Sequence, residues 1–350
     1  MRKSYIIFFI IFSFLFNIKD SFANTKKIYP YKKIPFKGYK GTLASFYKNS
    51  NTILFLDNDN NLVFYNITTG KTYKKELIKK GYIIQYPQIS PNYRYIIFAG
   101  YEGYFIGTHE IDSDKYFFMI YDLENNTYKK ILKNKDIVMW DSSFSNDSNY
   151  FLLRVADDVY VYNLKTKKVQ SIFKKIFDYY AEPSYVSCCS ENNENFITMG
   201  KGGTVLRNLK NNKITKDIIY NLGTINNSPR FSYNGKYILN GNINNSKNLK
   251  DIINFTKDFK NCSFLCNDCF SSKDSNFILC NFYAYKELCK NYQNSNGLFI
   301  YSIKEKKQIA YLINENNDLD TTDRNNIQYS PDDKYVLVKG KNYITIWKIK

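Results

Sequence analysis

The chain has 350 residues and a formal net charge of +18, with 33 tyrosines and 27 phenylalanines. This length allows one large core or two modest ones, so the number of domains must come from the sequence pattern. The only histidine, His109, leaves little room for imidazole catalysis or a histidine-ligated metal site.

The first 23 residues differ from the rest of the chain. Arg2 and Lys3 form a short basic start, residues 5–16 are almost entirely apolar, and small residues alternate up to Ala23. This pattern predicts a signal peptide over residues 1–23 and therefore a secreted or periplasmic protein. The alternative is a retained membrane anchor, but the apolar run is about 12 residues long and a spanning helix needs about 20. No later stretch is apolar enough to span a bilayer.

The chain stays basic after cleavage. Loss of Arg2, Lys3, Lys19 and Asp20 lowers the net charge from +18 to +16. Such a charge favours anionic lipid, polysaccharide or nucleic acid without selecting one of them. A general excess of lysine, asparagine and isoleucine in the composition is the alternative explanation.

A repeat of about 43 residues follows the signal segment. Its first half is a hydrophobic residue, a serine, four turn-forming residues and an aromatic residue that opens a β-rich run. Copies begin near residues 47, 90, 145, 190, 232, 272 and 330. Four of the six steps between them are 40 to 45 residues long, and the two long steps, of 55 and 58, require insertions.

The second half of the repeat is an alternating strand that ends in an aromatic, a polar and an aliphatic residue. Its copies are residues 64–67, 120–123, 161–164, 206–209, 300–303 and 346–349, with a blurred fifth copy around 252–255. A polar turn and another β-rich run follow most copies. Four short strands per repeat of this length predict a propeller blade. We therefore expect an all-β, seven-bladed propeller of four-stranded antiparallel blades over residues 34–350, after a linker over 24–33.

These motifs resemble two propeller families. The aromatic-polar-aliphatic strand ends look like those of Trp-Asp-repeat (WD-repeat) propellers. Residues 90–95 and 330–335 resemble the Ser-Pro-Asp-Gly-Lys hairpins shared by that family and TolB-type periplasmic propellers. The resemblance covers residues 36–350, but the Gly-His dipeptide of well-formed Trp-Asp repeats is absent. It implies a scaffold on which functions vary freely.

The chain ends suggest how the ring closes. The last copy stops at Lys350, directly after its third strand, so its blade lacks an outer strand. Residues 34–40 precede the first inner strand and are available to supply it. Such a closure would cover a bare sheet edge.

Two insertions mark one expected face. In a propeller the turns after strands one and three share a face, and residues 100–115 and 283–296 follow strand two, so both should project from the other face. Loops on a rigid scaffold often carry binding residues. The candidate ligand contacts there are Tyr101, Tyr104, Phe105, His109, Tyr283, Tyr285 and Tyr292. The alternative is that both segments are simply extended hairpins of an aromatic-rich protein.

The turns after strand three, on the opposite face, are rich in lysine. The lysines concerned are Lys71, Lys74, Lys75, Lys129, Lys130, Lys165, Lys167, Lys168, Lys210, Lys213, Lys304, Lys306 and Lys307. They make an anionic surface a possible partner. Exposed lysines also protect sheet edges from stacking, which is the alternative.

Five of the seven cysteines lie in or beside the sixth blade: Cys262, Cys266, Cys269, Cys280 and Cys289. In an exported protein they predict one or two local disulfides, with Cys269 and Cys280 on neighbouring strands. The odd count leaves at least one thiol unpaired or bonded to another chain. A zinc site is not expected because the usual ligand pairs are missing. Cys188 and Cys189 are expected to be buried strand residues rather than a redox pair.

No common catalytic motif or cofactor-binding signature occurs, so we predict no cofactor and no metal. Residues 57–61 begin like a calcium loop, but Leu62 takes the place of its glycine, which predicts a hairpin turn instead. The favoured function is an exported, non-catalytic scaffold that binds a protein or peptide. The alternative is a hydrolase or lyase acting on an extracytoplasmic polysaccharide, with Asp57, Asp59, Asp157 and Asp158 at the axial channel.

Overall fold

The structure is a computed structural model. It describes residues 26–36, 43–78, 82–102, 116–133, 140–155, 157–174, 185–200, 203–218, 230–239, 243–247, 251–253, 264–270, 275–282, 298–313, 327–340 and 342–350. These residues form 29 strands in seven sheets and no helix, which confirms an all-β fold. None of them belongs to a helix that could cross a membrane.

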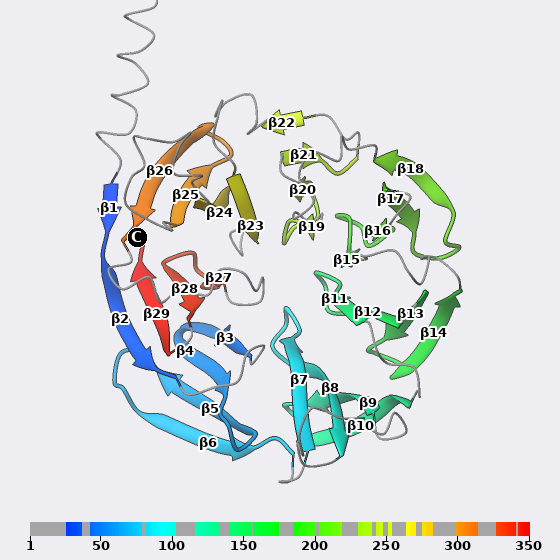
Figure 1. Cartoon of the computed structure of the whole chain (residues 1–350), viewed down its shortest axis with the longest axis horizontal. Coiled ribbons are helices and arrows are strands. Elements are labelled where there is room, and N and C mark those ends of the chain that lie inside the picture. Colours follow the sequence, from blue (N-terminus) through cyan, green and yellow to red (C-terminus); the bar gives the residue numbers. More distant parts are fainter. Residues whose placement is uncertain are drawn as a thin grey trace, which may run out of the picture.

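The seven sheets lie around a common centre in chain order, with the first strand of each nearest the centre (Figure 1). Sheet 1 contains β3 (Ala44–Tyr47), β4 (Asn49–Leu56), β5 (Asn61–Asn66) and β6 (Thr72–Glu76). Sheet 2 contains β7 (Tyr82–Ile89), β8 (Tyr95–Glu102), β9 (Tyr116–Asp122) and β10 (Thr127–Lys133). Sheet 3 contains β11 (Trp140–Phe144), β12 (Tyr150–Val155), β13 (Asp158–Asn163) and β14 (Lys168–Phe173). Sheet 4 contains β15 (Tyr185–Cys188), β16 (Asn195–Gly200), β17 (Gly203–Asn208) and β18 (Ile214–Ile218).

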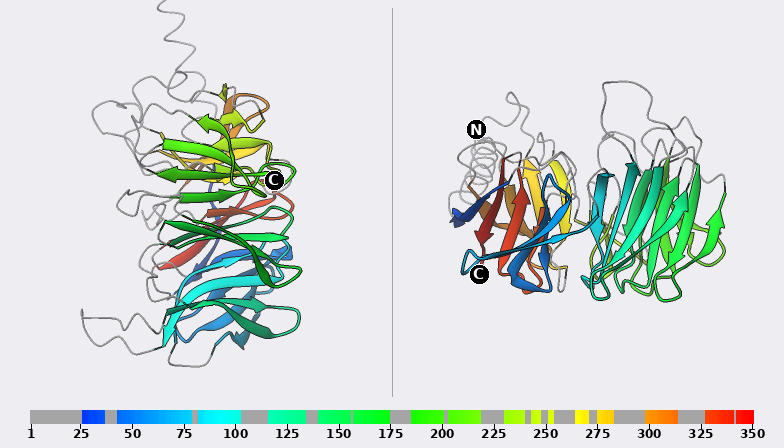
Figure 2. Two further views of the ribbon diagram at one scale, coloured as in Figure 1. Left: turned by 90° about the vertical axis from the view of Figure 1, so that its right-hand side faces the viewer. Right: turned by 90° about the horizontal axis from the view of Figure 1, so that it is seen from below.

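The remaining three sheets complete the arrangement. Sheet 5 contains β19 (Arg230–Phe231), β20 (Tyr237–Leu239), β21 (Ile243–Asn245) and β22 (Asp251–Ile253). Sheet 6 contains β23 (Phe264–Phe270), β24 (Phe277–Phe282), β25 (Leu298–Ser302) and β26 (Lys307–Leu312), with β1 (Lys26–Ile28) as a fifth strand. Sheet 7 contains β27 (Ile327–Tyr329), β28 (Tyr335–Lys339), β29 (Tyr343–Lys348) and β2 (Pro30–Pro35). In the side views the strands run from one face of the molecule to the other (Figure 2).

The hydrophobic core lies between the sheets. Second and third strands are largely apolar on both sides and buried, whereas outer strands such as β6 and β14 are mostly exposed. Within the described part of the chain, six clusters of buried side chains each combine residues of two neighbouring sheets. Leu54 of sheet 1, for example, belongs to one cluster with Phe98 of sheet 2. Burial of apolar area between neighbours is therefore what orders the sheets.

A buried serine organises the hairpin between the first and second strands. In sheet 7 the Ser330 hydroxyl accepts the Tyr335 N–H at 2.9 Å and donates to Asp332 Oδ1 at 2.8 Å. The same pair of bonds occurs at Ser90, Ser145 and Ser232, and all four serines are 0% exposed. The fourth hairpin residue has positive φ, and in sheet 5 it is Gly235, where a Cβ would lie 2.3 Å from the Glu191 nitrogen. The serine recurs in the sequence because its hydroxyl holds the hairpin between the first and second strands.

The aromatic-polar-aliphatic motif also has a structural cause. The N–H after the third strand donates to a carbonyl in the first hairpin in all seven sheets, at 2.7 to 2.8 Å, and these donors are Ile67, Leu123, Leu164, Leu209, Ser246, Ile303 and Ile349. The polar residue before each donor accepts N–H bonds of the following turn in six sheets. The turns after strands one and three therefore share one face, which we call the serine-hairpin face.

The fifth copy of this motif lies at residues 243–246 rather than around 252–255 as expected. Ser246 stands where the other copies have an aliphatic residue, yet its N–H donates to Lys236 O at 2.8 Å. The strands β20, β21 and β22 have only three residues each. Because this repeat is short, Ile252 lies in the outer strand of sheet 5. Its apolar side chain was wrongly taken for part of the third-strand motif.

The two ends of the described chain meet in sheet 7. β2 pairs antiparallel with β29, from Pro30 opposite Trp347 to Pro35 opposite Tyr343. The N-terminal side therefore supplies the outer strand, as expected, but through residues 30–35 rather than 34–40. β1 pairs in parallel with β26, so residues 24–33, expected to be a linker, contribute two strands.

Removal of residues 343–350 should destabilise the whole molecule. It deletes β29 and with it Ile344, Ile346 and Trp347, which are all 0% exposed. The lost burial predicts a decrease in melting temperature of at least about 10 °C, measured by circular dichroism. A chain that begins at Tyr29 is the control, because sheet 6 keeps its own four strands without β1. An unchanged melting temperature in the first variant would disprove the importance of the closure.

Ser145→Ala should leave buried backbone groups without a partner, because the hydroxyl accepts the N–H groups of Asn149 and Tyr150. We expect a loss of about 1–3 kcal/mol in the free energy of unfolding, measured by urea titration. The control is Thr68→Ala at an exposed turn position. Equal stability of both variants would show that the serine does not hold the hairpin.

Candidate functional site

Both predicted insertions occur between a second and a third strand. The first lies between the end of β8 at Glu102 and the start of β9 at Tyr116, and the second separates β24 from β25. They therefore leave their sheets at the end opposite the serine hairpins. Tyr104, Phe105, His109, Tyr283, Tyr285 and Tyr292 lie outside the described residues. The backbone of Tyr101 is the last-but-one position of β8, opposite Ile83 and Tyr116, and a shared binding site remains a prediction.

The Asp57 turn on this second face is a hairpin, as predicted. Asp57 Oδ1 accepts the N–H groups of Asp59 and Asn61, and Lys74 Nζ lies 2.9 Å from Asp57 Oδ2. Burial raises the pKa of Asp57, but the hydrogen bonds from Lys74 and Asn61 outweigh it and the pKa is lowered. The carboxylate is thus held ionised within its own turn.

The four carboxylates of the polysaccharide-cleavage alternative are divided between two sheets. Asp57 and Asp59 lie between β4 and β5 of sheet 1, whereas Asp157 directly precedes β13 of sheet 3 and Asp158 is its first residue, with sheet 2 between the two pairs (Figure 1). In the described part of the chain, no three metal-ligating side chains gather into a group. This arrangement lends no support to the enzymatic alternative.

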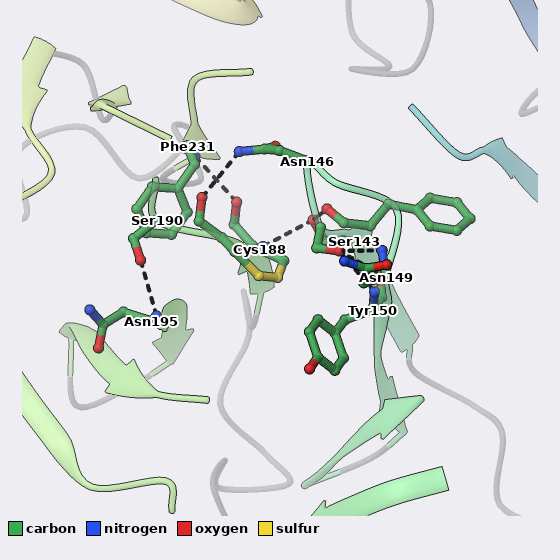
Figure 3. The surroundings of a disulfide bond; sticks show 12 residues. Ser143, Asn146, Asn149, Tyr150, Cys188, Ser190, Asn195 and Phe231 are labelled. Atoms are coloured by element: carbon green, nitrogen blue, oxygen red, sulfur yellow. Dashed lines mark hydrogen bonds between the residues drawn. A yellow bond between two sulfur atoms is a disulfide. The ribbon is translucent and has the colours of Figure 1, made fainter. Parts of the chain in front are cut away.

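Cys188 and Cys189 are buried, as expected, with 5% and 0% exposure, but they are joined by a disulfide bond that the sequence analysis did not predict (Figure 3). The Cys188 N–H donates to Ser143 Oγ at 3.0 Å, and Asn146 Nδ2 donates to Cys189 O at 3.3 Å. Both partners belong to sheet 3, so the cysteine pair lies at the junction of sheets 3 and 4. The adjacency of the two cysteines in the sequence was the available signal.

The cysteines of the sixth sheet remain candidates for disulfides. Cys262 and Cys289 lie outside the described residues. β23 and β24 pair as neighbours, and Cys269 is opposite Leu279 rather than Cys280. The pairing among these five residues stays a prediction.

Several lysines of the serine-hairpin face link neighbouring sheets. Lys32 Nζ donates to Ile67 O at 2.7 Å, and Lys129 Nζ donates to Lys167 O at 2.8 Å. Lys75 Nζ makes the equivalent bond to Asn126 Oδ1. In each case a lysine of an outer strand reaches the third-strand turn of the next sheet. The positions of these lysines in their strands are not all the same, so the sequence carried no common signal for this role.

A partly buried ion network joins sheets 2 and 3. Asp122 is 3% exposed, and its Oδ2 lies 3.1 Å from Arg94 Nη2 and 3.7 Å from Lys167 Nζ of the next sheet. Burial raises the pKa of Asp122, but hydrogen bonds from Arg94 and Asn125 outweigh it and lower the pKa. Asp122 is the polar residue of the aromatic-polar-aliphatic motif in the second repeat. In this repeat the motif therefore also forms an ion pair with the next sheet.

Two tyrosines belong to the hairpins of the serine-hairpin face. Tyr93 and Tyr233 belong to hairpins of sheets 2 and 5, on opposite sides of the centre (Figure 1). Burial raises the pKa of Tyr93 to about 12, with a smaller contribution from the Tyr233 phenol. The Tyr93 ring also lies 6.2 Å from that of Tyr47 of sheet 1. Aromatic contact area is therefore available where several hairpins approach each other.

Asp122→Asn keeps the acceptor for the turn but removes the charge. The folded-state pKa of Asp122 is depressed below 3.8, so its stabilisation is present above the unfolded value and is lost as the pH falls through the folded value. We expect a loss of about 2 kcal/mol near pH 7 that disappears in strong acid, measured by urea unfolding at several pH values. Glu124→Gln, at a half-exposed partner of Arg94, is the control and should cost little. A loss independent of pH would contradict the ionic role.

Comparison with known proteins assigns no family to the chain. No protein-family model matches it, and no curated protein is significantly similar to it. The resemblance to Trp-Asp-repeat and TolB-type propellers therefore remains a prediction from the repeat motifs.

Proposed function

We propose that the chain is an exported, non-catalytic, seven-bladed β-propeller that binds a protein or peptide through its inserted segments. The observation that carries the proposal is the order of the sheets. Seven sheets, antiparallel apart from the added strand β1, follow one another around a centre, and the last is completed by a strand from the N-terminal side. Four-stranded sheets in radial repetition are the architecture of propellers.

The repeat chemistry supports a divergent relative of the Trp-Asp-repeat or TolB-type families. Asp122 follows an aromatic residue at the end of a third strand, accepts an N–H of the following turn and binds Arg94. An aspartate at this position of the motif can therefore stabilise the sheet without a histidine partner. Residues 1–23 have the composition of a signal peptide, which supports export.

A binding role fits the described residues better than a catalytic one. The carboxylates considered for catalysis belong to separate sheets, and Asp57 is engaged by Lys74. The two long insertions begin and end on strands whose sheets are fixed by their neighbours. Long loops on such a scaffold are typical of recognition sites.

The experiment is an affinity capture of partners from the native envelope or medium, with the mature chain as bait. Replacement of residues 103–115 by a short glycine-serine turn, which leaves β8 and β9 intact, should remove the partners retained by the unmodified chain. Tyr233→Ser on the serine-hairpin face is the matched control and should retain them. Identical partners after loop replacement would reject the assignment of this insertion.

A further inference from the structure

Exposed apolar side chains are concentrated on the outer strands. Among the described residues, the first or second position of the outer strand is occupied by such a residue in five consecutive sheets, 7, 1, 2, 3 and 4. These residues, which we call the rim, are Tyr31 (49% exposed), Tyr73 (63%), Tyr128 (61%), Val169 (39%) and Ile214 (53%). An apolar side chain is therefore exposed at one structural position in five consecutive sheets.

The rim residues lie next to the serine-hairpin face. Tyr73, Tyr128 and Val169 each follow a third-strand turn and are registered opposite an aromatic residue of the third strand. The turn itself is held to the first hairpin by the repeated backbone bond. Tyr31 lies 5.8 Å, between ring centroids, from Tyr335, which directly follows the hairpin of sheet 7. The rim is therefore the border of one face.

Exposed lysines alternate with the rim. Lys168 precedes Val169, Lys213 precedes Ile214, and Lys210 lies in the same turn of sheet 4. No carboxylate of the described chain pairs with these three lysines, unlike Lys74 and Lys167. The border thus offers three exposed lysines that form no ion pair with a described carboxylate.

We propose that the rim and its lysines dock the protein onto an anionic lipid surface. Tyrosine rings and aliphatic side chains gain free energy at the boundary between headgroups and acyl chains, and lysines gain from the lipid charge. An acidic polysaccharide or a nucleic acid would satisfy the lysines but leave Val169 and Ile214 in water. An arc of contacts along five sheets also suits an extended surface better than a single peptide.

This role goes beyond the proposed binding function and uses the other face. Docking by the serine-hairpin face would leave the ends of β8 and β24, where the insertions begin, on the side away from the lipid. Replacement of residues 103–115 should then leave lipid binding unchanged, so the two proposals fail independently.

The test is co-sedimentation of the mature chain, residues 24–350, with vesicles. Binding is expected with equal parts of phosphatidylcholine and phosphatidylglycerol, but not with phosphatidylcholine alone, and should weaken as salt increases. A variant with Lys168, Lys210 and Lys213 changed to glutamine should bind about fivefold more weakly per lysine at low salt. The matched control changes Lys26, Lys27 and Lys174, exposed lysines that neither adjoin a rim residue in the sequence nor lie in a third-strand turn, to glutamine and should bind normally.

A second variant tests the apolar contribution. Tyr73→Ser, Tyr128→Ser and Ile214→Ser together should weaken vesicle binding by about tenfold or more while retention on heparin stays unchanged. All the substituted side chains are exposed, and the melting temperature of each variant verifies folding. Equal binding to neutral vesicles, equal weakening by the control lysines, or binding to heparin without binding to anionic vesicles would overturn the proposal.

Discussion

The pairing of β2 with β29 is the contact on which the rest of the structure depends, because it joins segments about 300 residues apart in the sequence. Without β2, sheet 7 would have three strands and an open outer edge. The same segment places Ile34 and Phe36 in the core shared with sheet 1, and Lys32 binds Ile67 O. On the other side, Trp347 Nε1 donates to Ile313 O of sheet 6. One strand exchange therefore fixes three consecutive sheets.

Away from that closure, side-chain hydrogen bonds join several neighbouring sheets, some near the centre and others at the outside. Near the centre, Gln88 Nε2 donates to Ser142 O, Asp141 accepts the Val186 N–H, and Ser187 Oγ accepts the Phe231 N–H, which links sheets 2 to 5 in sequence. At the outside, lysines bridge to the next third-strand turn. Polar side chains that the sequence alone would place on the surface thus form hydrogen bonds with backbone groups at the junctions between sheets.

The sequence predicted those parts of the fold that repeat. Serine hairpins and strand ends recur because the same backbone groups need the same partners in every sheet, so spacing alone located them. The outer strand at residues 30–35 was missed because two prolines and two lysines obscure the alternation around Ile34. The third strand of sheet 5, β21, was missed because the residue after it, Ser246, has no aliphatic side chain. The Cys188–Cys189 bond and the lysine bridges depend on particular neighbours, and no periodic pattern records them.

The position of the insertions follows from the same physics. On the serine-hairpin face, the bond from the third-strand turn to the first hairpin recurs in seven sheets and restricts the length of both turns. In the described part of the chain, the turn after strand two has no backbone bond that recurs in this way from sheet to sheet. Its length accordingly varies from two residues between β12 and β13 to 13 after β8 and 15 after β24. One face is therefore kept uniform by its own hydrogen bonds and suits a uniform contact, whereas the other can accept new recognition segments without disturbing the sheets.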